Sequence, residues 1–240
     1  ATAYNNLLHC TYIDIPSASS SGVPVASKAD TTIKLLQYEK FIRRVFNNAS
    51  LDEGGRFYGG WWQRIPKEWR ARIYIENAPV SEIDYSGLHI VLLYALKGIN
   101  YWSEVSADPY RIEGIEPSGR MRSLLKLVLL AAINAKDEQG AVMGVRKKIN
   151  FNKGEYGWVY DESVDLKEIV GLFAETHKSI SPYFFSGYGV NLQNLDSKIA
   201  SIVINYFTKK GIPVLCVHDS FVIASPHAEE LTHVINKTNI

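Results

Sequence analysis

Residues 212–224 read IPVLCVHDSFVIA, so two apolar runs flank the polar step His218-Asp219-Ser220. The length of these runs and their β-branched residues predict two strands joined by a tight turn. A carboxylate between apolar strands costs free energy unless it is paired, hydrogen-bonded or bound to a metal. Asp219 is therefore a candidate metal ligand, although a single aspartate in such a place also serves as an ordinary turn residue.

A second aspartate ends a strand upstream. Residues 71–76 and 80–84 have the pattern of short strands on either side of residues 77–79, and a helical period begins at Gly87. Asp84 ends the second of these strands, where it can also cap the helix that follows. Two carboxylates at strand ends, in a chain without another metal motif, favour a divalent-cation site as a hypothesis.

Helical periods dominate the rest of the chain. Residues 16–29 are rich in Ser, Ala, Pro and Gly and have the composition of a loop or linker, and residues 49–63 show no clean period. Helices are predicted at 30–47, 87–98, 120–135, 137–149, 163–178, 192–209 and 226–238. Antiparallel strands mixed with helices in this order predict the α+β fold class.

Composition limits the location and the partners of the protein. Its 240 residues suit one large domain or two lobes that share a core. The chain has no apolar run of about 18 residues and no secretory signal pattern, so we expect a cytoplasmic protein without a membrane partner. Cys10 and Cys216 are expected to be reduced core thiols. The net charge of +1 is low for a nucleic-acid binder, but residues 64–72 carry four basic residues against one acidic residue.

A series of segments, taken in order, resembles the family A DNA polymerases. Residues 82–89 (EIDYSGLH) look like motif A, and residues 217–221 (VHDSF) look like motif C. Between them, Arg122 and Lys126 have the Arg-x-x-x-Lys spacing of motif B, on the fingers helix. Three shorter matches, to the family's Gly-Arg step, its Gln-Asn-Ile-Pro step and its glutamine before motif C, fall at residues 55–57, 63–66 and Gln193.

The resemblance implies a right-hand polymerase palm with an antiparallel sheet, helical fingers and a thumb that is reduced or missing. Residues 1–50 are then an N-terminal segment with one reduced thumb-like helix, and residues 51–98 are the first part of the palm with motif A. Residues 99–190 are the fingers with the motif B helix, and residues 191–240 are the second part of the palm with motif C. Because so small a thumb would grip duplex poorly, an accessory protein is expected to supply the grip.

The resemblance also implies roles for single residues. Asp84 and Asp219, with the carbonyl of Tyr85, are expected to bind two Mg²⁺ ions, for which Mn²⁺ can substitute. Candidates at the nucleoside triphosphate are Arg122, Lys126, Tyr85, His89 and Asn134, and Lys126 is also a catalytic candidate that protonates the leaving group. Candidates at the DNA primer–template or single-stranded template are Arg56, Gln63, Gln193 and His218. The tryptophans at 61, 62 and 69 either stack on nucleic acid or belong to the core.

The sequence departs from the family in the nucleotide pocket. The motif A glutamate, which usually blocks a 2′-hydroxyl, aligns with His89. The motif B tyrosine and glycine align with Asn134 and Ala135, and the aromatic residue one turn earlier aligns with Leu130. These changes lead to the hypothesis that the protein discriminates weakly between ribonucleotides and deoxynucleotides.

The expected activity is template-directed DNA polymerisation, and a primase-like role in phage or mobile-element replication is the variant that a small thumb favours. A relative of the single-subunit RNA polymerases is an alternative within the same chemistry. A polymerase-like domain that binds nucleic acid without activity is an alternative of another kind. The departures in motif B favour that last alternative, and the two intact aspartates oppose it.

Overall fold

The computed structural model describes residues 11–13, 23–24, 32–33 and 39–238. The chain divides into two compact units, one formed by Ala1–Tyr85 with Gln193–Asn239 and the other by Ser86–Leu192. Both helices and antiparallel sheets are present, so the α+β class is confirmed. No helix in the described part of the chain combines the length and the apolar composition of a membrane span.

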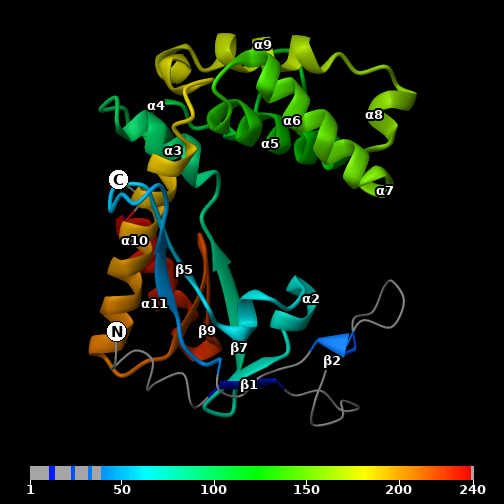
Figure 1. Ribbon diagram of the computed structural model, residues 1–240. Helices are drawn as coiled ribbons and strands as arrows, with labels where there is room; N and C mark the ends of the chain where they lie inside the picture. Colours follow the sequence, from blue (N-terminus) through cyan, green and yellow to red (C-terminus); the bar gives the residue numbers. More distant parts are fainter. Residues whose placement is uncertain (1–10, 14–22, 25–31, 34–38, 239–240) are drawn as a thin grey trace. The chain divides into compact units, whose positions relative to one another are not determined.

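An antiparallel sheet is the centre of the first unit (Figure 1). Among the described strands, its order is β1 (Thr11–Ile13), β6 (Ile73–Ile75), β7 (Ala78–Asp84), β9 (Ser220–Ala224) and β8 (Val214–Val217). Almost all residues of β8 and β9 are buried, as their apolar sequence requires. The predicted hairpin around the polar step is confirmed, and so are the two predicted strands at 71–76 and 80–84.

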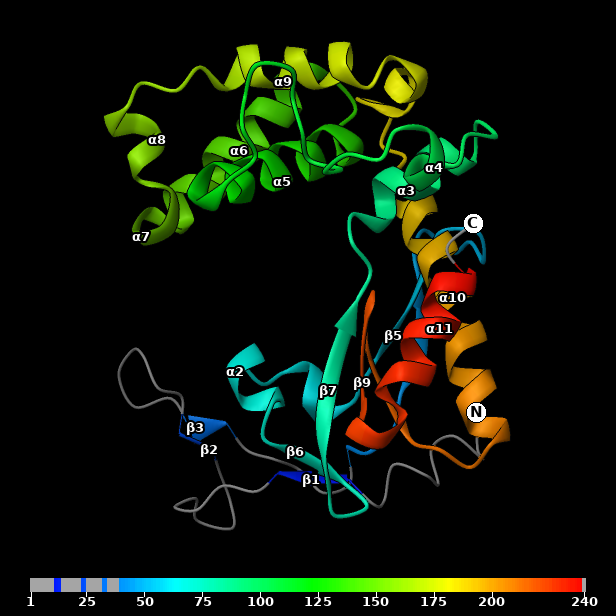
Figure 2. The ribbon, with the colours of Figure 1, turned by 180° about the vertical axis from the view of Figure 1, so that it is seen from behind.

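Helices and smaller strand pairs complete the first unit. The helix α10 (Gly189–Lys209) enters it from the second unit, and α11 (Ala228–Thr238) packs against β7 and β9, so the helices predicted at 192–209 and 226–238 are confirmed. Figure 2 shows these two helices from the reverse side. The remaining elements are β2 (Val23–Pro24) paired with β3 (Thr32–Ile33), β4 (Arg43–Phe46) paired with β5 (Gly54–Tyr58), η2 (Trp61–Gln63), α2 (Lys67–Arg70) and η4 (Ser225–His227).

The predicted thumb-like helix at 30–47 is wrong where the structure describes that range. Residues 32–33 and 43–46 are strands, and residues 34–38 lie outside the described residues. Exposed and half-buried residues alternate along β4, which is the period of a strand. Its backbone hydrogen bonds go to β5, a partner that a helical reading of apolar spacings does not consider.

Other predictions also fall partly on residues outside those that the structure describes. The predicted linker at 16–29 contains the described strand β2, and its other residues lie outside the described residues, as does Cys10. Cys216 is a buried free thiol, as predicted, and burial raises its pKa to about 12. Trp61 and Trp62 are 3% and 0% exposed, so both belong to the core.

The second unit is helical in its described residues. The helices predicted at 87–98, 120–135, 137–149 and 163–178 are confirmed, with boundaries that differ by a few residues. The helices are α3 (Leu88–Ala95), α4 (Tyr101–Glu104), α5 (Gly119–Asn134), α6 (Glu138–Phe151), α7 (Lys153–Tyr156), α8 (Trp158–Asp161), α9 (Leu166–Thr176) and η3 (Lys178–Tyr183). Packing among α5, α6 and α9 buries their apolar faces, which include Leu124, Val145 and Phe173.

Capping residues set where these helices begin. The side chain of Asp137 accepts a hydrogen bond from the amide of Gly140 at 2.6 Å, at the start of α6. Asp165 accepts bonds from the amides of Lys167 and Glu168 at 2.9 and 3.1 Å, at the start of α9. Such caps satisfy amides that have no partner within the helix, so these short sequences specify their own boundaries.

A buried histidine closes α9. His177 is 0% exposed, its ring stacks on Phe173, and its Nδ1 lies 3.0 Å from the hydroxyl of Tyr94. Burial lowers the pKa of His177 to about 4. The folded chain therefore holds this side chain neutral at pH values where an unfolded histidine takes up a proton.

This difference predicts how stability depends on pH. Because the pKa of His177 falls from 6.5 to about 4 on folding, its contribution is complete above about pH 6.5 and is lost as the pH falls toward 4. We expect the free energy of unfolding to fall between pH 7 and 4.5 by about 2 kcal/mol more in the parent than in His177→Gln. Urea denaturation followed by circular dichroism measures this. The exposed His233→Gln is the control and should behave as the parent, whereas equal pH dependence in parent and His177→Gln would contradict the expectation.

Candidate metal and nucleic-acid site

Asp84 ends a strand next to the hairpin loop that carries Asp219. Asp84 is the last residue of β7, and its register partner on β9 is Ser220, the residue after Asp219. The amide of Tyr85 donates to the carbonyl of Asp219 over 3.4 Å, which extends this pairing by one step. Asp84 is exposed and Asp219 is half-buried, so solvent and ions have access to the pair.

The cap reading of Asp84 is wrong. The cap position of α3 is Gly87, in a left-handed conformation with φ of 61°, and no side chain caps this helix. A Cβ at Gly87 would lie 2.5 Å from the ring of Pro109, so the position requires glycine both sterically and conformationally. Asp84 is therefore not the N-cap residue of α3.

Asp219 occupies the tip of a two-residue hairpin loop. Val217 pairs with Ser220, which leaves only His218 and Asp219 between β8 and β9. His218 has a φ of 58°, a left-handed conformation that costs a residue with a side chain about 1 kcal/mol. Such a conformation persists when the surrounding structure fixes it, and contacts on both sides of this loop do so.

One set of contacts holds the strand before the loop. The carbonyl of Cys216 accepts hydrogen bonds from Trp62 Nε1 at 3.0 Å and from Gln63 Nε2 at 2.9 Å. Gln63 also donates to the carbonyl of Phe57 at 2.9 Å and accepts from the amide of Gly59 at 3.1 Å. Gln63 thus joins β5 to β8, and its role at nucleic acid stays a prediction.

A second set of contacts holds the strand after the loop. Glu82 lies on the same sheet face as Asp84, because residues two apart on a strand point to the same side. Arg70 donates to both Glu82 oxygens, at 3.0 and 2.8 Å, and the two side chains are only 13% and 16% exposed. Ser220 Oγ lies 3.1 Å from Glu82 Oε1 and 3.2 Å from the carbonyl of Val217.

The charge on Glu82 follows from these partners. Burial alone would raise its pKa, but the hydrogen bonds and the charge of Arg70 lower it, with smaller contributions from Ser220 and Lys67. Glu82 is therefore ionised at neutral pH and neutralises Arg70. The basic segment around α2 is in this way attached to the strand that carries Asp84.

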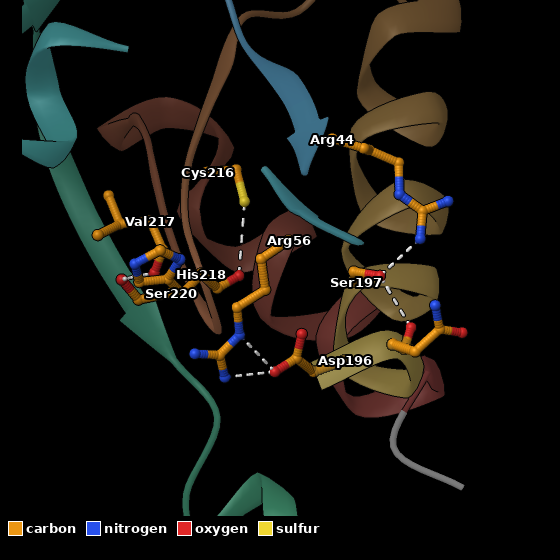
Figure 3. A network of polar contacts seen from close by, with 9 residues as sticks. Arg44, Arg56, Asp196, Ser197, Cys216, Val217, His218 and Ser220 are labelled. Carbon is orange, nitrogen blue, oxygen red and sulfur yellow. Dashed lines mark hydrogen bonds and ion pairs between the residues drawn. The ribbon is translucent and has the colours of Figure 1, made fainter. Parts of the chain in front are cut away.

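Arg56 joins β5 to α10, as Figure 3 shows. It projects from β5, and its Nε donates to Asp196 Oδ2 at 2.9 Å, where the side chain of Asp196 is only 1% exposed. Burial alone would lower the pKa of Arg56, but Asp196 and the charge of Asp219 raise it. Asp219 belongs to the hairpin loop, so its charge and that of Asp196 on α10 both act on Arg56.

His218 lies in the same neighbourhood. Its ring packs edge-on against Tyr58 with the centroids 5.2 Å apart, and its buried Nδ1 has no hydrogen-bond partner among the described residues. Burial and then the charge of Arg56 lower its pKa, so the ring is neutral at neutral pH. A neutral imidazole with one unsatisfied nitrogen is suited to receive a hydrogen bond from a ligand.

Arg44 attaches the β4–β5 hairpin to the same helix. Its Nε donates to the carbonyl of Gly55 at 2.8 Å, and its Nη2 donates to Ser197 Oγ at 2.7 Å (Figure 3). Ser197 is the residue after Asp196, so two neighbouring positions of α10 receive arginines from adjacent strands. This arrangement fixes Arg56 relative to the loop.

Two further candidates lie in the first unit. Tyr85 is buried, its hydroxyl lies 2.5 Å from Thr238 Oγ1, and burial raises its pKa. This hydrogen bond fixes the side chain of Tyr85, whose backbone carbonyl is the predicted third ligand and follows directly on Asp84. Gln193 is half-buried, at the point where α10 enters the first unit.

The other nucleotide candidates belong to the second unit. Arg122 Nε donates to Asp108 Oδ2 at 2.9 Å, and Arg122 and Lys126 both lie over the ring of Tyr110, at 4.8 and 5.8 Å from its centroid. These two cations therefore share one side of their helix. Asn134 donates to the carbonyl of Leu130 at 2.7 Å. His89 is half-buried on α3.

Sequence reasoning missed Glu82, Arg70 and Asp196 as parts of this site. Arg70 was noticed only as a member of the basic segment 64–72, and Glu82 only as the first residue of the motif A match. Asp196 lies three residues after Gln193, inside the helix predicted at 192–209, where an acidic residue has no distinguishing local signal. The ion pair of Arg56 with Asp196 spans 140 residues, and that of Arg70 with Glu82 spans 12, so neither follows from a local spacing in the sequence.

The site offers oxygen donors, which are the ligands that Mg²⁺ prefers. Among the described residues, no group of three or more His, Cys, Asp and Glu side chains is arranged to hold a metal ion. Mg²⁺ in phosphoryl-transfer sites keeps several waters and takes one or two carboxylates together with substrate phosphates. Asp84, Asp219 and the carbonyl of Tyr85 supply donors of that kind at adjacent strand ends.

Comparison of the chain with family models gives no match, and comparison with curated proteins gives none either. A function for this chain therefore has to be inferred from the geometry of the residues described above.

Glu82→Gln tests the network beneath the loop. The change removes the counter-ion of Arg70, whose side chain is 13% exposed, and we expect it to lower the free energy of unfolding by about 1–3 kcal/mol. Urea denaturation is the measurement. Glu76→Gln, at an exposed position next to the same sheet, is the control and should stay within about 0.5 kcal/mol of the parent. Equal effects of the two changes would show that the network does not stabilise the fold.

Proposed function

We propose that the protein is a template-directed nucleotidyltransferase of the DNA polymerase type, with Asp84 and Asp219 as its metal-binding carboxylates. One observation carries the proposal. More than half of the chain separates these residues in sequence, yet the register of β7 and β9 makes them neighbours. The resemblance to motifs A and C pairs the same two aspartates, and it depends on residue types alone, not on the pairing of the strands.

The reaction joins a primer to an incoming nucleotide. The 3′-hydroxyl attacks the α-phosphorus of a nucleoside triphosphate, the new P–O bond forms, and the bond to the leaving pyrophosphate breaks. Bound Mg²⁺ or Mn²⁺ supplies Lewis-acid stabilisation of the attacking and leaving oxygens. The chain contributes the carboxylates of Asp84 and Asp219 and the carbonyl of Tyr85 as ligands. Lys126 is assigned to the pyrophosphate, which it protonates, and Arg122 to the triphosphate charge.

The surroundings of the aspartates support this role. A catalytic constellation must hold its groups within about 0.5 Å of the working geometry. The loop that carries Asp219 has only two residues, and hydrogen bonds from Gln63 and Ser220 fix the strands on both sides of it. His218 belongs to the same loop and Arg56 feels the charge of Asp219, and we assign both to the primer–template next to the reacting end.

The residues proposed to select the nucleotide differ most from those of the family A DNA polymerases. His89 and Asn134 stand where the family has a glutamate and a tyrosine, so the proposed pocket lacks the group that blocks a 2′-hydroxyl. A primase-like role, which uses ribonucleotides on a single-stranded template, is compatible with this pocket. An accessory protein that grips the duplex remains part of the proposal.

Asp84→Asn and Asp219→Asn test the chemistry. Each change removes one carboxylate charge from the ion site, so we expect primer extension to fall by about 10²–10⁴-fold, because metal-ion stabilisation contributes several kcal/mol. Fluorescence anisotropy with a labelled primer–template should show binding within about twofold of the parent. The exposed Asp161→Asn on α8 is the control and should extend primers as the parent does. Activity at the parent level in either active-site variant would refute the assignment.

The sugar specificity has its own test. Purified protein is given a primer–template, Mg²⁺ or Mn²⁺, and each of the eight nucleotides, and we expect both ribonucleotides and deoxynucleotides to be incorporated. His89→Glu should lower ribonucleotide incorporation by about tenfold relative to deoxynucleotides. Strict rejection of ribonucleotides by the parent would contradict the hypothesis. Extension with ribonucleotides alone would favour the RNA polymerase alternative, and no extension with either would favour the inactive domain.

A further inference from the structure

After its first turn, which contains Glu138, the solvent-facing side of α6 carries positive charge without an acidic residue. Residues 139–154 contain four basic residues and neither Asp nor Glu. All four are exposed, and none makes an ion pair with a described residue; they are Arg146, Lys147, Lys148 and Lys153. The helix dipole accounts for part of this charge, because α6 ends at Phe151. It does not account for the apolar side chains exposed among these cations.

Two of the most exposed large apolar side chains lie on the same helix. Phe151 is 84% exposed and Met143 is 60% exposed. Met143, Lys147 and Phe151 are spaced four residues apart, so they form one stripe along the helix. The opposite side of α6 is buried through Val145 and Ile149. The helix therefore already has its packing face, and the stripe of Met143, Lys147 and Phe151 is a second face.

We propose that this second face, the α6 face (Met143, Arg146, Lys147, Lys148 and Phe151), binds single-stranded nucleic acid. The ring of Phe151 stacks on a base, and the three cations, with Lys153 beside them, neutralise phosphates. An exposed aromatic ring among cations is the combination by which proteins hold single strands without reading their sequence. In a duplex the bases are stacked on one another, so their faces are closed to Phe151.

The chemistry of the face argues against two other anionic ligands. A membrane surface would require a continuous apolar side, whereas Met143 and Phe151 are separated by a lysine. An acidic peptide would satisfy the cations but gives an exposed phenylalanine no planar partner. The inference deepens the proposed function by giving a single-stranded template a place on the second unit. It does not require the aspartates to be catalytic.

The test is the binding of the full chain to a fluorescein-labelled oligothymidylate, measured by anisotropy at several salt concentrations. Phe151→Ala should weaken binding by about 5–100-fold, and Phe151→Leu, which keeps an apolar side chain, should lose nearly as much. Changing Arg146, Lys147 and Lys148 together to Gln should lower the slope of log affinity against log salt by about 2. Lys167→Gln, an exposed lysine on α9, is the matched control and should lower the slope by less than half as much as the triple change.

The outcomes separate this inference from the proposed function. Unchanged binding in both Phe151→Ala and the triple variant, with folding verified by circular dichroism, would overturn it. Binding to anionic vesicles with the same dependence on Phe151, and none to the oligonucleotide, would also overturn it. Asp219→Asn should retain oligonucleotide binding in full. If Phe151→Ala weakens binding while Asp219→Asn still extends primers, the α6 face stands and the catalytic assignment fails.

Discussion

The antiparallel pairing of β7 with β9 is the constraint on which the proposed site depends. The ladder runs from Val80 opposite Ala224 to Asp84 opposite Ser220 without an irregularity in register. Side chains alternate between the faces of a sheet. A slip of one residue would therefore turn both Glu82 and Asp84 to the other face. Burial of the β9 side chains resists such a slip, because all five residues of the strand are buried and each would have to be repacked.

The polar contacts around the hairpin loop have a different purpose from the apolar ones. Apolar burial holds β8 and β9 in the sheet, but it does not determine the backbone of His218, whose left-handed φ opposes folding locally. Hydrogen bonds to Cys216 before the loop and from Ser220 after it fix that backbone. Asp219 is therefore presented by a short, strained and well-supported turn. Strain of this kind is found where structure serves a ligand or a reaction.

Much of this architecture follows from local sequence, and the exceptions share a cause. The hairpin at 212–224, the strand ending at Asp84 and the long helices were predicted, because apolar runs and helical periods are local signals. The strand β4 was mistaken for a helix, because only its pairing with β5 stabilises the extended form. In the same way, the ion pairs that support the site depend on contacts between distant segments. A sequence pattern names the two aspartates, but only the folded sheet shows what holds them.

The most direct measurement of the central claim is the binding of Mn²⁺, followed by electron paramagnetic resonance, with a primer–template whose primer lacks a 3′-hydroxyl and the next nucleotide present. Asp84→Asn and Asp219→Asn should each weaken Mn²⁺ binding, and the double variant should be little weaker than either single variant, because both residues serve one site. Parent-like Mn²⁺ binding by both single variants would show that the two carboxylates do not share an ion, and the proposed chemistry would have no site.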